Sequence, residues 1–147
     1  MGKIQKPILI SHRANLDGRI IEKENNPDYI KSAIEYFHVE IDVWNINNNW
    51  FLGHDKPQYK IGEIFLQNDK FYCHAKNLDA FNKMLDNKKI HCFWHQNDDY
   101  ALTSKGFIWT YPKKQICEKS IIVSNKLVRD CYGICTDYPL KLERLLK

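Results

Sequence analysis

Short apolar runs rich in β-branched and aromatic residues recur along the chain, and their length and alternation are typical of buried or half-buried strands. The clear strand patterns are at 7–11, 38–44, 50–54, 70–75 and 89–94, and weaker ones are at 107–110, 120–123 and 132–135. Between them, helical patterns are predicted at 26–37, 77–86 and 139–146. Their starts are marked by Asn26 with Pro27, by Asn77 and by Pro139, which suit the first positions of a helix.

Strands that alternate with helices favour a parallel α/β sheet or barrel. A complete (β/α)8 barrel usually needs about 250 residues, whereas this chain has 147. The sequence therefore predicts one α/β domain over residues 1–147, a reduced TIM-type (β/α) barrel with several helices shortened or missing. A second copy of the chain could cover the flank that the missing helices leave open, so a homo-oligomer is one expected arrangement.

Charge and apolar content exclude two classes of partner. The net charge is +4, and no block of five Lys or Arg residues occurs, so no nucleic-acid-binding tail is expected. No stretch approaches the 18 apolar residues of a transmembrane helix. The five cysteines form no C-x-x-C pair and favour reduced thiols in a cytoplasmic protein, with a Cys131–Cys135 disulfide as the alternative.

Ionisable residues gather at the carboxyl ends of the predicted strands. In a parallel α/β fold these ends meet on one face, where ligands bind. We therefore expect a shared site from side chains that follow or end six separate runs: His12 and Arg13, Glu40 and Asp42, His54 and Asp55, His74 and Lys76, His95 and Gln96, and Asp137.

Glu40 and Asp42 are the most informative pair. They are two residues apart on one predicted strand, so their side chains point to the same side. Two carboxylates that face the same interior repel each other unless a cation lies between them. A divalent metal ion is one such cation, and a cluster formed by Arg13 and Lys76 is the alternative.

The ordered motifs resemble the amino-terminal signature of glycerophosphodiester phosphodiesterases, within the superfamily of phosphatidylinositol-phospholipase-C-like phosphodiesterases. The matching pieces, in the family's order, are His12-Arg13, Glu24-Asn25, Glu40-Ile41-Asp42 and His54-Asp55, and the segment GICTDYP at 133–139 resembles the family's closing turn. The resemblance covers roughly the first third and the last tenth of the chain. It implies a TIM-barrel-like fold and metal-assisted hydrolysis of a small phosphodiester.

Carried over position by position, the resemblance makes His12 and His54 the general acid–base pair. Glu40 and Asp42 would hold the metal, and Arg13 would bind phosphate oxygens. Two histidines suit this work because their unperturbed pKa is about 6.5. The sequence leaves open which histidine is the acid.

The chain departs from the family pattern in its first loop and on its third strand. Ala14 replaces the usual Gly after His-Arg, and His74-Ala75-Lys76 replaces Glu-x-Lys. Lys76 fits a phosphate contact. If His74 is a ligand, Mn²⁺ or Zn²⁺ is favoured. If it is not, two carboxylates, waters and substrate could hold Mg²⁺ or Ca²⁺.

Further substrate contacts and competing functions stay open. Trp94 and His95 are candidate substrate contacts, with packing as the alternative for Trp94. A cyclising phosphodiester lyase would use the same residues, and an inactive barrel would serve as a binding module. An unrelated zinc site could instead involve His74, His91 or His95, although their spacing matches no standard zinc pattern.

Overall fold

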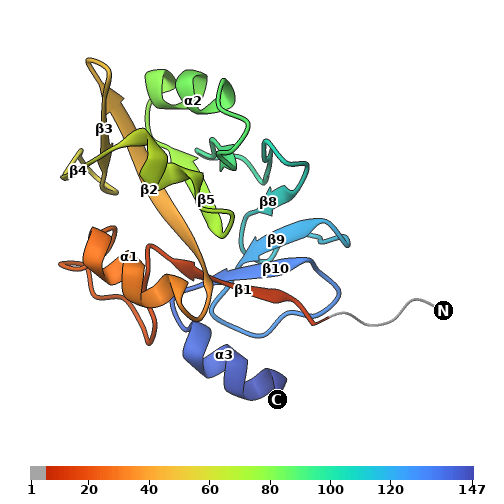
Figure 1. Cartoon of the computed structure of the whole chain (residues 1–147). Coiled ribbons are helices and arrows are strands. Elements are labelled where there is room, and N and C mark those ends of the chain that lie inside the picture. Colours follow the sequence, from red (N-terminus) through yellow and green to blue (C-terminus); the bar gives the residue numbers. More distant parts are fainter. Residues whose placement is uncertain (1–5) are drawn as a thin grey trace.

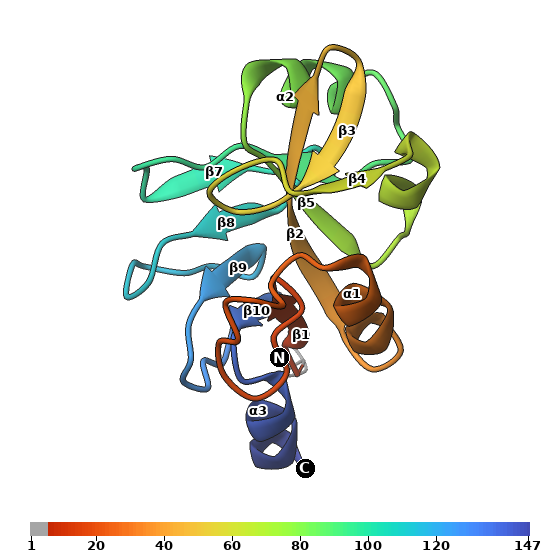
Figure 2. The same ribbon diagram turned by 90° about the vertical axis from the view of Figure 1, so that its left-hand side faces the viewer.

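The structure is a computed structural model that describes residues 6–147. Its centre is one curled, ten-stranded mixed sheet. Seven strands form a parallel series, in the spatial order β6 (Cys92–Phe93), β5 (Phe71–Ala75), β2 (His38–Ile46), β1 (Ile8–His12), β10 (Gly133–Thr136), β9 (Ser120–Val123) and β8 (Ile108–Thr110). Figure 2 shows how the sheet curls from β2 through β1, β10 and β9 to β8.

Three antiparallel strands complete the sheet. They are β3 (Asn49–Leu52), β4 (Tyr59–Ile61) and β7 (Tyr100–Leu102). The β2–β3 hairpin turns at Asn47 and Asn48, whose φ values are 51° and 66°. Two consecutive positive φ values are typical of a type I′ turn, which matches the twist of a hairpin. The strand patterns predicted at 38–44 and 50–54 are therefore the two arms of a hairpin.

Across residues 6–147, three short α-helices and one 3-10 turn accompany the sheet. The helices are α1 (Pro27–Ile34), α2 (Leu78–Leu85) and α3 (Pro139–Leu146), and the turn is η1 (Glu63–Gln67). The side chains of Asn26 and Asn77 accept hydrogen bonds from backbone N–H groups at the starts of α1 and α2, as predicted. Helix α1 packs on β2 and α3 packs on β1, whereas α2 packs on β2, β5 and β6 (Figure 1).

The prediction of a reduced TIM-type (β/α) barrel is wrong. The protein is a mostly β half-barrel with a mixed sheet, and helices do not alternate with its strands. Residues 111–119 join β8 to β9, and residues 124–132 join β9 to β10. Both connections are shorter than the dozen or more residues that a helical crossover needs, and both are irregular. The antiparallel strands β3 and β4 further extend the sheet where a barrel would have a helix.

The two faces of the sheet bury different side chains. The outer face packs Val39, Ile41 and Val43 of β2 against α1 and α2, in a cluster that includes Met84. Inside the curl, residues from six strands form a second cluster, comprising Ile10, Tyr72, Phe93, Trp109, Ile121 and Cys135. Each fully buried aliphatic side chain contributes about 1.5–3 kcal/mol. Side chains alternate along β2. Because Val39 and Val43 are buried on the outer face, Glu40 and Asp42 point to the inner face.

Membrane spans and disulfides were also predicted to be absent. Within residues 6–147, no helix has the length and apolar character to cross a bilayer. All five cysteines are free thiols, so the alternative of a Cys131–Cys135 disulfide does not hold in this structure. Four are buried, and Cys117 is exposed.

Candidate active site

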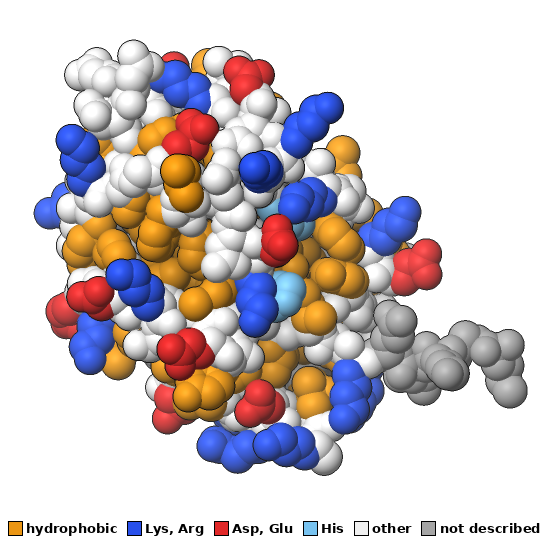
Figure 3. All heavy atoms as spheres, viewed as in Figure 1, with side chains coloured by type: hydrophobic (Ala, Val, Ile, Leu, Met, Phe, Trp, Pro, Cys, Tyr) orange, Lys and Arg blue, Asp and Glu red, His pale blue; other side chains and the backbone are white. Residues whose placement is uncertain are grey.

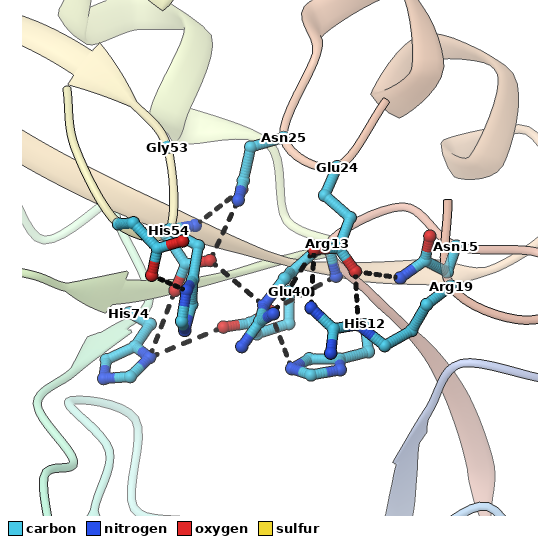
Figure 4. Close-up of polar contacts among 12 residues, drawn as sticks. His12, Arg13, Asn15, Arg19, Glu24, Asn25, Glu40, Gly53, His54 and His74 are labelled. Atoms are coloured by element: carbon cyan, nitrogen blue, oxygen red, sulfur yellow. Dashed lines mark hydrogen bonds and ion pairs between the residues drawn. The ribbon is translucent and has the colours of Figure 1, made fainter. Parts of the chain in front are cut away.

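Strand register brings the ionisable residues of four strands together. In the parallel ladders, His12 of β1 pairs with Glu40 of β2, and Asp42 pairs with His74 of β5. Asp137 directly follows β10, whose Thr136 pairs with Ser11. Glu40 and Asp42 lie in the middle of β2, which continues to Ile46, at the level where β1 and β5 end. Figure 4 shows His12, Glu40 and His74 pointing toward one another from these strands.

Glu40, Asp42 and His74 form a compact group of possible metal ligands. His74 Nδ1 lies 3.3 Å from Asp42 Oδ1 and 3.6 Å from Glu40 Oε2. Two ligands held about 2.0–2.2 Å from one ion lie roughly 3.0–3.5 Å apart, so these separations fit a shared cation. Asp42 Oδ1 is buried and accepts no hydrogen bond from the described residues. A buried carboxylate oxygen of this kind is stabilised by a positively charged partner.

His74 is oriented by its neighbours. Its Nε2 lies 2.8 Å from the backbone carbonyl oxygen of His95, to which a protonated Nε2 donates. Its ring stacks on Phe93, with centroids 4.9 Å apart and planes inclined by 14°. With the proton on Nε2, neutral His74 presents the Nδ1 lone pair to the carboxylates. Metal-ligating histidines are held by the same kind of carbonyl contact at the other nitrogen.

The charges explain why this group requires a cation. Burial opposes the charged imidazole, but the attraction of the nearby Asp42 and Glu40 carboxylates outweighs it and raises the pKa of His74 to about 9. Burial likewise opposes the Asp42 carboxylate, yet His74, Arg13 and Asn25 hold the pKa of that carboxyl well below its usual range. A proton on His74 or a divalent ion can balance the two carboxylates, so a metal must displace that proton to bind.

Arg13 is held by carboxylates beside the metal ligands. Its Nε lies 3.4 Å from Asp42 Oδ2, and its Nη1 donates to Glu24 Oε1 at 3.3 Å. Asn25 pairs with Asp42 twice: its Nδ2 donates to Oδ2 at 2.9 Å, and its Oδ1 accepts from the Asp42 backbone N–H at 2.8 Å. The Glu24-Asn25 dipeptide, which carried part of the resemblance, thus orients Arg13 and Asp42.

His12 and Asp137 form a second unit next to these ligands. His12 Nδ1 lies 2.9 Å from Asp137 Oδ1, and its Nε2 lies 3.9 Å from Glu40 Oε1. Burial disfavours the charged ring, but Asp137 and Glu40 outweigh it and raise the pKa of His12. Asn15 Nδ2 donates to Asp137 Oδ1 at 3.2 Å. The sequence pattern predicts Asp137 at a strand end but gives it no role. Its position in the GICTDYP motif is the sequence feature that could have identified it as a site residue.

His54 lies on a more open segment. The backbone N–H of Gly53, the residue before His54, donates to the Asp42 carbonyl at 3.1 Å, which holds this segment against the middle of β2. The His54 side chain is 37% exposed, and its Nδ1 lies 2.7 Å from the exposed carboxylate of Asp55. Figure 4 shows its ring on the same side as His74. Within residues 6–147, no hydrogen bond or ion pair joins His54 to His12.

The remaining predicted contacts are placed differently. Trp94 packs edge-on against Phe81 of α2, with ring centroids 5.9 Å apart. It belongs to the hydrophobic cluster on the outer face of the sheet, not to the group of ionisable residues inside the curl. His95 reaches His74 through its backbone, while its ring contacts the Asp98 carbonyl. Lys76 follows β5 and is half-buried, with no ion pair among the described residues. The structure therefore brings together the proposed ligands, Arg13 and His12, but not Trp94.

Comparison of the chain with protein-family models, with curated proteins and with solved structures finds no match.

Proposed function

We propose that the chain is a divalent-metal-dependent hydrolase of small phosphodiesters, with the site described above as its active centre. The observation that carries the proposal is the arrangement of His74: its Nδ1 faces Glu40 and Asp42, whose buried Oδ1 accepts no hydrogen bond from the described residues. Beside it lie a histidine with a carboxylate partner and a buried guanidinium. The ordered resemblance to glycerophosphodiester phosphodiesterases supplies the reaction class.

Glu40, Asp42 and His74 would hold the metal. A bound divalent ion there supplies Lewis-acid stabilisation of phosphate charge. One nitrogen and two carboxylate ligands favour Mn²⁺ or Zn²⁺ over Ca²⁺. Because the five thiols are free, we place this activity in a reducing compartment such as the cytoplasm.

The chain's own groups have distinct tasks in this proposal. Arg13 adds positive charge where phosphate oxygens would lie. Glu24 binds its guanidinium directly, and Asn25 fixes Asp42, the other carboxylate beside it. Asp137 holds Nδ1 of His12, which leaves Nε2 to exchange a proton with a reacting oxygen. His54, on the open segment after β3, is the proposed second proton-transfer group.

Metal binding and turnover test the proposal directly. Hydrolysis of bis-p-nitrophenyl phosphate and glycerophosphodiesters should stop in EDTA and return with Mn²⁺ or Zn²⁺, and the product observed by ³¹P NMR decides between a linear and a cyclic phosphate. Calorimetric titration with Mn²⁺ should show one site that Glu40→Gln abolishes. Glu35→Gln, which changes an exposed acid at the carboxyl end of α1, is the matched control.

Two results would contradict the proposal. Full turnover in EDTA would exclude metal dependence, and wild-type-like turnover by His12→Ala would remove the proton-transfer role. Binding of metal and phosphodiester by the wild-type protein without turnover would favour the alternative of a binding module.

A further inference from the structure

A cavity of about 350 Å³ opens on the far side of His12 from the metal ligands. It lies at the ends of β9 and β10 and between the two loops that follow β8 and β9. Its lining consists of His12, Pro112, Lys113, Val123, Ser124, Asn125, Lys126, Cys135 and Asp137. His12 contacts Asp137 in the lining and approaches Glu40 of the metal ligands, so it lies between the cavity and the metal site.

The charges around this cavity are unbalanced. Lys113 and Lys126 are exposed at its rim, and neither forms an ion pair with any of residues 6–147. The single carboxylate in the lining, Asp137, is already engaged by His12 and by Asn15. The two lysines therefore favour an anionic ligand group as the occupant. In Figure 3, histidine atoms reach the surface near the middle of the view, beside Lys, Arg and acidic side chains.

The loops that carry the lysines have defined conformations. Lys113 has a φ of 69°, in the left-handed region that non-glycine residues rarely adopt. Ser124 Oγ donates to the Lys126 carbonyl at 2.9 Å and accepts from the Lys126 N–H at 3.0 Å. Asn125 Oδ1 accepts from the Asp137 N–H at 3.0 Å and from Thr136 Oγ1 at 3.1 Å. The side-chain amide of Asn125 therefore has its N–H donors left for a ligand.

We infer that this cavity receives the ester arm of the substrate that projects past His12 and selects an arm bearing a second negative charge, such as a carboxylate or phosphate. The inference rests on the proposed function, because it takes the scissile phosphate to lie between His12 and the metal ligands. The cavity volume is near the lower end of the roughly 300–1,000 Å³ found for ligand pockets. A small polar arm fits this volume better than an acyl chain.

Two phosphodiesters that differ only in one arm provide the test: glycerophosphoglycerol and glycerophosphoglycerate, in which a carboxylate replaces a CH₂OH group. The ratio of kcat/KM for the charged to the neutral diester is measured in the wild type and in the double variant Lys113→Gln/Lys126→Gln. The matched control is Lys31→Gln/Lys60→Gln, which removes two exposed lysines elsewhere.

We expect the wild type to prefer the charged diester. The cavity variant should lower the ratio about three- to twentyfold, because each exposed charge contributes modestly, whereas the control should leave it unchanged. The preference should also shrink at 0.5 M NaCl, since salt screens exposed charges.

The outcomes separate this inference from the proposed function. If the neutral diester is hydrolysed equally by all three proteins and the ratio does not change in the cavity variant, the inference is overturned and the proposed function stands. If no diester is hydrolysed, the proposed function fails, and calorimetry with the same two compounds decides the inference. Tighter binding of the charged compound that the cavity variant loses supports it, and equal binding overturns it.

Discussion

The two halves of the site are built in opposite ways. On the side of β1, β2 and β5, the charged groups are buried and interlocked: Asp42 contacts Arg13, Asn25 and His74. On the side of β9 and β10, the charges are exposed lysines on irregular loops. Preorganised buried charges suit chemistry that needs fixed positions. Exposed charges on loops suit recognition, which tolerates exchange of one side chain for another.

The largest expected effect comes from breaking the buried half. Asp42→Asn removes one carboxylate from both Arg13 and His74, and removing one partner of a buried ion pair costs about 3–5 kcal/mol. We expect a loss of that order in the free energy of unfolding from urea titration, together with loss of Mn²⁺ binding. Glu35→Gln should change neither. An Asp42→Asn protein as stable as the wild type would show that the buried network does not hold this half together.

The link between the halves is the pair His12–Asp137. Asp137→Asn keeps the shape of the side chain but removes the charge that raises the pKa of His12. We expect turnover to fall about 10²–10⁴-fold, the usual contribution of a positioned proton-transfer group. In NMR titrations the pKa of His12 should move to lower values. If the pKa of His12 stays where it is in the wild type, Asp137 is not its partner in solution.

A contrasting histidine lies within the apolar interior of the curl. Burial, with the charges of Lys105 and His38, lowers the pKa of His91 to about 4, and its Nε2 lies 2.7 Å from Thr103 Oγ1. Since the folded pKa is below the unfolded value of about 6.5, the stabilising neutral form is fully present above pH 6.5. Stability should fall by about 2–3 kcal/mol between pH 6.5 and 4.

The measurement for His91 is the urea midpoint as a function of pH. His91→Gln keeps a side chain that can hydrogen-bond to Thr103 but cannot titrate, so its stability should depend less on pH across this window. The same pH dependence in wild type and variant would assign the effect to other groups.

Local sequence signals explain the regular half of the molecule better than the loop half. The caps at Asn26 and Asn77 and the alternation in β2 were readable because they depend on neighbours along the chain. For Trp94 the structure shows the packing alternative: β6 ends at Phe93, which points into the curl, so the next side chain, Trp94, turns outward. The contacts of Asn125 with Asp137 link separate loops and leave no periodic pattern.

The smallest expected effect concerns the first loop, where Ala14 replaces the glycine of the resembling family. Ala14 is fully buried and has a φ of 72°, a conformation that costs a non-glycine residue about 1–2 kcal/mol. Ala14→Gly removes that strain, which stabilises the folded state. It also removes a buried methyl group and increases the entropy of the unfolded chain, and each of these destabilises the folded state by roughly 0.5–1 kcal/mol. The terms nearly cancel, so we expect the free energy of unfolding to change by less than about 1 kcal/mol.

Ala14→Val sharpens this last prediction, because a β-branched side chain adds both left-handed strain and volume to a buried position. Its cost should exceed about 2 kcal/mol in the same urea titration. If valine is tolerated as well as glycine, the loop that carries Arg13 adapts readily. The distinction between a fixed chemical half and an adjustable recognition half would then not apply to its first loop.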